Sequence, residues 1–301
     1  MPDGTTTFTD EIRGDVTFDH KFVPDFVLVR ADGSPLYTLA VAVDDILMGV
    51  THVLRGEDLL SSTPRQIRVY QAMGVKIEDY PVFAHLPFVM GQDNAKLSKR
   101  NGEVSIAWYR EQGYLPEAIL NYLARLGWSH GDDEIFSREQ FLSWFNLDHL
   151  GRSAAQFDEA KLRWVNAQHI KTTSDDALAS MVQAILLEQG IQADDRLAAI
   201  CAMFKDRCDT LLVLANWAAK FYTPVTIASE DYAKHVTPAV LPALEAFAQA
   251  LQSCEWTVAG VAATIKQTLA DFGLKMPQLA MPVRVLTAGT AQTPSVDAML
   301  V

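Results

Sequence analysis

Residues 51–74 read THVLRGEDLLSSTPRQIRVYQAMG, and this stretch predicts a strand that passes directly into a helix. Its first part is rich in apolar and β-branched residues, which favour a strand. The helix is marked by a Ser/Thr cap at residues 62–63 and by Pro64 at its first position. Apolar residues lie along one face, namely Ile67, Tyr70 and Met73, and Gly74 is the stop signal. Residues 55–58 therefore lie where a strand becomes a helix, the place where open α/β sheets bind ligands.

The neighbouring segments of the first third also favour strands. GDVTF at 14–18, DFVLVR at 25–30 and PLYTLAVAV at 35–43 are short runs rich in β-forming residues. The segment ADGSP at 31–35 predicts a turn between two of them. The first third is therefore expected to be a small α/β sheet.

Helical patterns dominate the rest of the chain. SREQFLSWF at 137–145 carries Ser137 and Gln140 at the spacing of a capping box. From Asp158 to about Phe272 the apolar residues recur almost only with a helical period. The change in composition near Phe157 predicts a domain boundary, followed by an all-helical second half.

The composition is that of a globular protein with more than one domain. The chain has 301 residues, of which 49% are hydrophobic, and a formal net charge of −12. No apolar run reaches the roughly 18 residues that a membrane helix needs, and the first residues lack the pattern of a signal peptide, so a cytoplasmic protein is expected. Cys201, Cys208 and Cys254 have no metal-binding or disulfide spacing and are predicted to be buried free thiols. The acidic balance argues against nucleic-acid binding by the whole surface but leaves room for a local basic site.

Such a basic site occurs in DNAKLSKRNGE, residues 93–103. Lys96 and Lys99 enclose the hydroxyl of Ser98 and are followed by Arg100, a composition that suits the shifting charge of a polyphosphate. Alone, the pattern is weak, because short basic loops are commonly solvated surfaces. The sequence on both sides of the loop adds weight to the phosphate interpretation.

KLSKR at 96–100 resembles the KMSKS signature of class I aminoacyl-tRNA synthetases, in the form typical of bacterial glutamyl-tRNA synthetases. The resemblance continues through residues 37–74 before the loop and through 109–141 and 157–170 after it. It implies an α/β remnant of a Rossmann-type catalytic domain followed by an all-α anticodon-binding domain, mostly helical overall. The resemblance implies four divisions. Residues 1–32 are the tail of an acceptor-binding insertion, and residues 33–76 are the second half of the nucleotide-binding fold. Residues 77–156 are a stem-contact region with the KLSKR loop, and residues 157–301 are the helical anticodon-binding domain.

The resemblance also implies the residues that act on ATP. They are Lys96, Ser98, Lys99, Arg100, Asp58 and Val89. Lys99 and Lys96 are the implied catalytic residues, since the signature loop closes on ATP and stabilises the charge of the departing pyrophosphate. Val89 matches a position expected to meet adenine through its backbone. Mg²⁺ is expected to come with ATP, and no metal site is expected in the protein itself.

The glutamate site follows from the same resemblance. Tyr37, Val41 and Arg55 match positions that bind the amino acid, and the guanidinium of Arg55 suits a carboxylate. Some relatives have asparagine where this chain has Val41, so that amide contact is absent. Asp44 and Asp45 match a paired-aspartate motif and are given a structural or orienting role only.

Each of these residues also has an ordinary structural interpretation. Tyr37 could be a strand aromatic, and Arg55 could form a surface pair with Glu57 or Asp58. Val41 and Val89 could simply be core residues. His52 and His85 are given no catalytic role, because lone histidines are usually structural. In SHGDDE, residues 129–134, a polar loop is favoured over a metal site, since the spacing of metal ligands is missing.

One part of the family pattern is missing. The first ATP-binding signature is of the H-x-G-H type, and none of the seven histidines lies in such a sequence. We therefore expect a chain that lacks the N-terminal half of the catalytic domain and the extreme C-terminus, and that does not form glutamyl-adenylate by itself.

The function expected of the parent enzyme is ATP-dependent ligation of L-glutamate to tRNA(Glu), by a monomer with no membrane partner. The alternative is a non-catalytic tRNA-binding module, because the helical half could persist without the active site. Glutamine-specific relatives are disfavoured, since they end in β-barrels and this chain ends in predicted helices.

Overall fold

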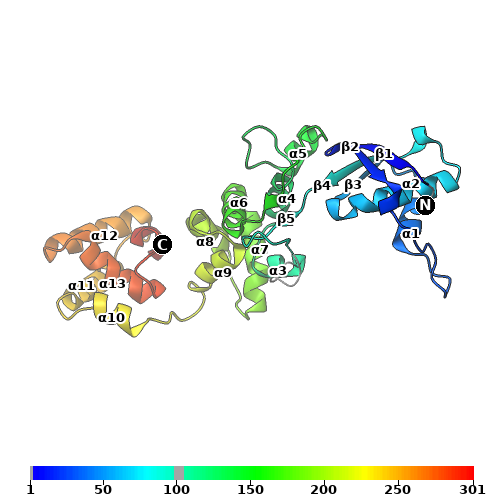
Figure 1. Cartoon of the computed structure of the whole chain (residues 1–301). Helices are drawn as coiled ribbons and strands as arrows, with labels where there is room; N and C mark the ends of the chain where they lie inside the picture. The colour runs from blue at the N-terminus through cyan, green and yellow to red at the C-terminus, as the bar shows by residue number, and fades with distance from the viewer. Residues whose placement is uncertain (1–2, 98–104) are drawn as a thin grey trace. The chain divides into compact units, whose positions relative to one another are not determined.

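A computed structural model describes residues 3–97 and 105–301. The chain divides into two compact units: residues 1–108 with 116–165, and residues 109–115 with 166–301. Within the described parts, no helix has both the length and the apolar character needed to cross a membrane. The α/β first part and the all-helical second part agree with the fold class predicted from the sequence (Figure 1).

The first unit contains a four-stranded sheet with the order β2-β1-β4-β3. The strands are β1 (Thr5–Asp10), β2 (Gly14–Asp19), β3 (His52–Gly56) and β4 (Val82–Leu86). β1 and β2 form an antiparallel hairpin, whereas β4 pairs in parallel with both β1 and β3. The carboxyl ends of β1, β3 and β4 therefore lie at the same end of the sheet.

Two helices cover this sheet, namely α1 (Tyr37–Leu47) and α2 (Thr63–Ala72). The helices and the sheet share an apolar core. It consists of Ala42, Ile67, Val69, Tyr70 and Phe83, with Leu39, Ile46 and Val53 packed against it. The short 3-10 segments η1 (His20–Phe22), η2 (Glu57–Ser62) and η3 (Ile77–Asp79) connect these elements. The strand-to-helix order expected for residues 51–74 is confirmed, since β3, η2 and α2 follow one another.

Two predicted strands are wrong. Residues 35–43 belong mostly to helix α1, because Leu39, Ala42 and Ile46 are spaced three and four apart and face one core. No side chain caps the start of this helix, so the sequence contains no start signal for it. Residues 25–30 form only an isolated bridge, Val29 with Pro35, which flanks the predicted turn.

The predicted Ser/Thr cap of α2 is also wrong. Ser62 precedes the helix, but its side chain makes no capping hydrogen bond. The chain already has helical dihedral angles at Ser62, because η2 leads straight into α2. The backbone groups that a cap would serve are thus reached by a continuing helical path.

The rest of the first unit holds a small parallel pair, β5 (Val89–Met90) with β6 (Ala155–Gln156), and short helices. These helices are α3 (Ile106–Glu111), α4 (Pro116–Arg125) and α5 (Arg138–Trp144), and α3 continues into the second unit. The capping box at Ser137 and Gln140 is present, as predicted. Trp128 is buried among the rings of Phe136 and Phe141.

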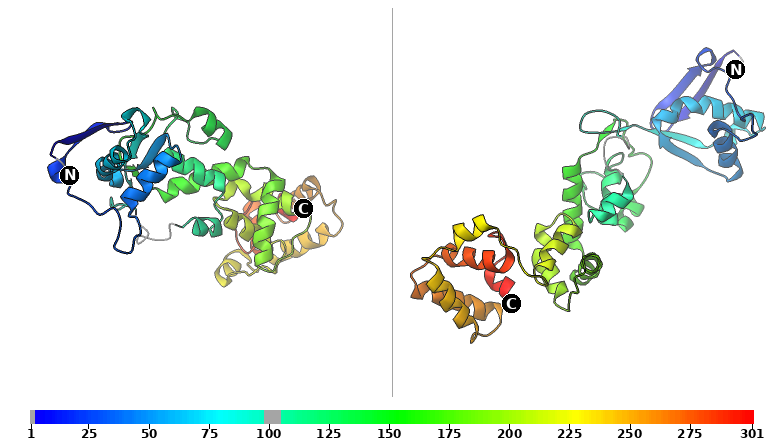
Figure 2. Two further views of the ribbon diagram at one scale, coloured as in Figure 1. Left: turned by 90° about the vertical axis from the view of Figure 1, so that its right-hand side faces the viewer. Right: turned by 90° about the horizontal axis from the view of Figure 1, so that it is seen from below.

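Helices dominate the second unit, in which Figure 2 shows those of residues 229–300 as one cluster. They are α6 (Glu159–Thr172), shared with the first unit, α7 (Asp175–Glu188), α8 (Leu197–Phe204), α9 (Leu211–Ala219), α10 (Ser229–His235), α11 (Leu241–Leu251), α12 (Val258–Asp271), α13 (Met276–Ala288) and α14 (Val296–Leu300), with the 3-10 segment η4 (Lys205–Arg207) between α8 and α9. Phe247, Val261, Ile265 and Leu279 form the apolar core of α11 to α14.

A buried amide holds residues 109–115 to this second unit. Asn166 Oδ1 accepts from Leu115 N at 2.8 Å, and Asn166 Nδ2 donates to Asp209 O at 2.6 Å. Gly113 has a φ of +81°, and a Cβ there would lie 2.5 Å from the backbone nitrogen of Leu212. A residue without a side chain is therefore required at this contact.

Candidate functional site

Three polar side chains meet where the parallel strands end. Asp10 is the last residue of β1, Arg55 is the fourth residue of β3, and His85 is the fourth residue of β4. The register places Arg55 directly opposite His85, and Asp10 opposite Phe83. This is the end of an α/β sheet at which ligands bind.

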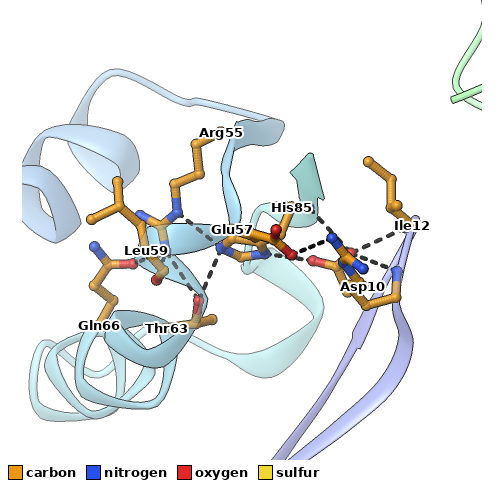
Figure 3. A network of polar contacts seen from close by, with 9 residues as sticks. Asp10, Ile12, Arg55, Glu57, Leu59, Thr63, Gln66 and His85 are labelled. Carbon is orange, nitrogen blue, oxygen red and sulfur yellow. Dashed lines mark hydrogen bonds and ion pairs between the residues drawn. The ribbon is translucent and has the colours of Figure 1, made fainter. Parts of the chain in front are cut away.

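A continuous set of hydrogen bonds links these residues to helix α2 (Figure 3). Asp10 Oδ2 lies 2.5 Å from His85 Nδ1, and Arg55 Nε donates to His85 Nε2 at 3.0 Å. Arg55 Nη2 donates to Thr63 Oγ1 at 3.0 Å and to Gln66 Oε1 at 2.7 Å. Four of these five residues are almost completely buried, with exposed fractions between 0% and 1%: Asp10, His85, Thr63 and Gln66.

The network determines the proton positions on His85. A guanidinium can only donate, so Nε2 of His85 must be the accepting nitrogen. Nδ1 then carries the proton and donates it to the carboxylate of Asp10. Burial lowers the pKa of His85, and although Asp10 raises it, the nearby Arg55 lowers it again, so that the ring is neutral.

Asp10 is held as a carboxylate in the same network. Burial raises its pKa, but hydrogen bonds from the His85 ring and from the backbone of Arg13, His85 and Ile12 outweigh this effect. The pKa of Asp10 therefore lies below its ordinary value. Next to it, Glu57 pairs with Arg13 and accepts from Phe88 N, which joins β1 to the segment after β3.

Two of the predicted glutamate-binding residues, Tyr37 and Arg55, both affect the buried side chain of Tyr70. Tyr37, Asp45 and Arg55 all act on the pKa of the buried phenol of Tyr70, which burial itself raises most. Tyr70 Oη lies 3.4 Å from Asp45 Oδ2, and burial also raises the pKa of Asp45. Tyr37 is half exposed. Tyr37 and Arg55 thus lie in the surroundings of Tyr70. Tyr37 belongs to helix α1, so its interpretation as a strand aromatic is wrong.

The surface pair considered for Arg55 is wrong. Its guanidinium bonds to His85, Thr63 and Gln66, whereas Glu57 pairs with Arg13 and Asp58 with Lys96. The strand register explains the difference, since it turns the side chain of Arg55 toward β4 and α2.

The start of the basic loop lies against the segment that follows β3. Lys96 Nζ lies 3.5 Å from Asp58 Oδ2 and 4.1 Å from the centre of the Phe88 ring. Leu97 N donates to Val89 O at 2.9 Å, so the chain turns back on itself after β5. Lys96, Asp58 and Val89, three residues predicted to meet ATP, are thereby brought together. Ser98, Lys99 and Arg100 lie outside the described residues.

Gly56 makes room for this arrangement. A Cβ at Gly56 would lie 2.5 Å from Asp58 Oδ1. The glycine thus lets the carboxylate of Asp58 fold back toward the end of β3. The ion pair of Asp58 with Lys96 is about half exposed on both sides, so it contributes little to stability and leaves both groups open to a ligand.

Val41 and Val89 are half-buried, and neither belongs to the fully buried core. The sequence interpretation missed the polar network around Arg55, in which Thr63, Gln66 and His85 contact Arg55 and Asp10 contacts His85. The available signal was positional: polar residues at the ends of strands that a βαβ connection makes parallel. The sequence interpretation gives His85 no catalytic role, because lone histidines are usually structural.

Side chains of the polar segment 129–134 have partners within the protein. His130 Nδ1 lies 3.0 Å from Asp133 Oδ2 and its ring stacks on Trp144, while Glu134 pairs with Arg125. In residues 3–97 and 105–301, no group of three metal-binding side chains comes together. All three cysteines are free, but only Cys201 and Cys208 are buried, whereas Cys254 is partly exposed. Burial raises the pKa of Cys201 to about 11 and of Cys208 to about 12.

The chain matches two known families along its length. Residues 1–164, more than half of the chain, match the catalytic domain of the class I tRNA synthetases (E and Q). Residues 177–301 match an anticodon binding domain. The first match includes the strand-end network and Lys96, and the second includes most of α7 and the helices α8 to α14.

Individual relatives give the same result. The chain is 57% identical to a glutamate–tRNA ligase of Verminephrobacter eiseniae over 99% of this chain and 63% of the relative. It is 58% identical to that of Paracidovorax citrulli, over 99% of this chain and 62% of the relative. The chain thus spans less than two thirds of the length of these curated relatives.

A solved structure supports the similarity of fold. A crystal structure of a glutamate tRNA ligase from Elizabethkingia meningosepticum, in complex with its amino acid, matches with a TM-score of 0.87 and 30% identity. The match covers 99% of this chain and 63% of that one.

Proposed function

Because this chain belongs to the class I tRNA synthetases of the glutamate and glutamine group, we propose that it acts in the ATP-dependent ligation of L-glutamate to tRNA(Glu). Enzymes of this class use ATP. The observation that carries the proposal is the meeting of Lys96 with Asp58, three residues after Arg55 on the segment that leaves β3. A cation for phosphate and a cation for a carboxylate thus lie at one end of the sheet.

In the proposed reaction, a glutamate carboxylate oxygen attacks the α-phosphate of ATP, and the bond from that phosphate to pyrophosphate breaks. Lys96 and Lys99 stabilise the charge on the departing pyrophosphate, and Ser98 and Arg100 bind the same phosphates. A ribose hydroxyl of tRNA then attacks the activated carbonyl and displaces AMP. Asp58 and Val89 contact the nucleotide in this scheme.

Arg55 is proposed to bind a carboxylate of glutamate through Nη1, a buried donor that has no partner among the described residues. Tyr37 and Val41 are proposed to line the same site, one helical turn apart on α1. Mg²⁺ would arrive with ATP. We further propose that the protein works in the cytoplasm as a monomer.

The proposed division of labour follows the sequence-based boundaries. Residues 33–76 and 77–156 supply the nucleotide and loop region, after an acceptor-side segment at 1–32. Residues 157–301 supply the helical anticodon-binding part, in line with the family match at 177–301. We also propose that these 301 residues do not form the adenylate alone, because none of their histidines lies in an H-x-G-H sequence.

A second candidate function is tRNA binding without chemistry. It is favoured by the separate apolar core of α11 to α14, which gives the helical part its own source of stability. A nitrocellulose filter assay with tRNA(Glu) at graded salt tests this function on the chain itself. Either function predicts binding that weakens with salt.

Only the ligase predicts exchange in a chimera of this chain with further residues of a relative. The chain is joined to those residues of the Verminephrobacter eiseniae relative that lie outside its 305 matched residues. We expect glutamate-dependent ATP–pyrophosphate exchange, which falls about a hundredfold in Lys96→Ala. A folded, tRNA-binding chimera without exchange would contradict the ligase proposal and favour the binding module.

A further inference from the structure

The guanidinium of Arg55 has most of its donors occupied by the protein. Nε donates to His85, and Nη2 donates to Thr63 and Gln66, with Leu59 O a further 3.5 Å contact. These two nitrogens form the edge that would otherwise grip a carboxylate side-on. Nη1 is buried and has no hydrogen-bond partner among the described residues.

This arrangement depends on the protonation of His85. Its Nε2 can accept from Arg55 only when the proton is on Nδ1, and Nδ1 donates that proton to Asp10 Oδ2, which lies 2.5 Å from Nδ1. The groups that face the ring are Asp10 from β1, Arg13 after β1, Arg55 from β3 and Thr63 from α2. A proton on Nε2 would place a second cation against Arg55, which the neutral ring avoids.

Stability alone does not explain this network. Burying charged and polar groups costs free energy of desolvation, and well-packed apolar residues at such positions are often equally stabilising. The network instead gives the guanidinium one orientation, because its three bonds hold it to two separate elements: β4 through His85, and α2 through Thr63 and Gln66. A donor fixed in this way binds its ligand with little loss of side-chain entropy.

We propose that Asp10 and His85 are positioning residues, which orient Arg55 so that Nη1 is the donor presented to a carboxylate of the amino-acid substrate. That the ligand is glutamate rests on the proposed function. The orientation of Arg55 rests only on the contacts described above. Asp10 acts through His85, and His85 acts on Nε of Arg55; neither needs to touch the substrate.

Two substitutions of one residue separate positioning from folding. In His85→Asn the side-chain amide occupies the place of Nδ1 and donates to Asp10, but no acceptor reaches Arg55 Nε. In His85→Gln the amide oxygen reaches the place of Nε2 and accepts from Arg55. Both variants are polar and of similar size, so His85→Gln is the matched control for His85→Asn.

The first readout is the Nε–H signal of Arg55 in ¹H–¹⁵N spectra of the 301-residue chain. We expect a signal protected from solvent exchange in the wild type. Exchange should be about tenfold faster in His85→Asn and within about threefold of wild type in His85→Gln. Equal protection in wild type and His85→Asn would overturn the proposal, since Arg55 would then be held without His85.

The second readout needs no variant and therefore does not depend on whether one folds. Long-range ¹H–¹⁵N correlations of the His85 ring report which nitrogen carries the proton. A neutral ring protonated on Nδ1 supports the proposal. A ring protonated on Nε2 contradicts it, because Nε2 could then not accept from Arg55.

Calorimetric titration with L-glutamate separates this inference from the proposed function. We expect the affinity to fall about tenfold in His85→Asn and to stay within about threefold in His85→Gln. Binding that is equal in all three proteins would refute the positioning role. If the spectra behave as expected while glutamate does not bind, the orientation of Arg55 stands and the assignment of its ligand fails.

Discussion

The strand ends around Arg55 and the helices α11 to α14 both contain buried side chains, but these side chains are polar in the first region and apolar in the second. Around Arg55 the buried residues are polar and hydrogen-bonded, with Asp10, His85 and Gln66 nearly inaccessible to solvent. Around Leu279 they are apolar. The apolar core stabilises its helices by burying apolar surface. The polar network costs free energy of desolvation and holds the guanidinium of Arg55 in one orientation.

This contrast suggests that the two regions respond differently to substitution. In the helices, stability should follow the apolar volume that is removed. At the strand ends, stability and ligand binding should depend on whether each donor keeps its acceptor. A third region, the start of the basic loop, should affect ligands with almost no effect on stability.

The largest loss of stability is expected from Asp10→Ala. It removes the acceptor of His85 Nδ1 and of three backbone amides in a buried site, so we expect a loss of about 3 to 5 kcal/mol in the free energy of unfolding. Urea denaturation measures this value. Asp15→Ala, at an exposed position of β2, is the control and should cost no more than about 0.5 kcal/mol. Equal losses in both variants would remove the contrast.

A slightly smaller loss is expected from Leu279→Ala in α13. Leu279 is only 1% exposed, so its truncation should leave a cavity and cost about 3 kcal/mol. Leu286→Ala on the same helix removes the same atoms from a side chain that is 39% exposed, and should cost about 1 kcal/mol or less. The comparison is read from denaturation monitored by circular dichroism. Equal costs would mean that burial does not determine stability in these helices.

Acidification should weaken the strand-end network before the helical core. The pKa of His85 in the folded chain lies below its ordinary value of 6.5, because of burial first and Arg55 next. Between these two pKa values the unfolded chain binds more protons, so the free energy of unfolding decreases as the pH falls below about 6.5. Asp10, whose pKa is also lowered, adds a further decrease below its ordinary value of 3.8.

Urea midpoints from pH 7 to pH 4 measure this dependence. The decrease that begins near pH 6.5 should disappear in His85→Gln, which has no titrating ring. Stability that rises as the pH falls through this range would have the wrong sign for a neutral buried His85.

The smallest effect on stability is expected from Lys96→Ala. Its ion pair with Asp58 is about half exposed, so we expect a change below about 1 kcal/mol. Lys76→Ala, which removes a similar exposed pair with Glu78, is the control. Only Lys96→Ala should weaken ATP binding, measured with a fluorescent analogue. A loss of stability equal to that of Asp10→Ala would show a structural role for Lys96.

The strand-to-helix transition at residues 51–74 was predictable because its signals are local. Pro64 and Gly74 mark the ends of α2, and Ser137 with Gln140 marks the start of α5. Helix α1 was not predictable in this way. It lacks a capping side chain, and its run of Val and Ala residues also fits a buried strand.

The site shows the same limit. Lys96 and Arg55 stand out in the sequence because charged residues occur where a strand or turn ends. Asp10 and His85 are 75 residues apart, and only the register of β1, β4 and β3 brings them to Arg55. Long-range pairing of this kind leaves no local pattern, so His85 resembled an ordinary structural histidine.

The most direct test of the account is the Michaelis constant for glutamate of the chimera with the Verminephrobacter eiseniae relative carrying Arg55→Lys. Lysine keeps the charge but has no planar group that could bond to His85 and Gln66 while presenting Nη1. In ATP–pyrophosphate exchange, we predict that the Michaelis constant for glutamate rises at least about tenfold, while that for ATP stays within about twofold. An unchanged constant for glutamate would contradict the assignment of the strand-end network to the amino-acid substrate.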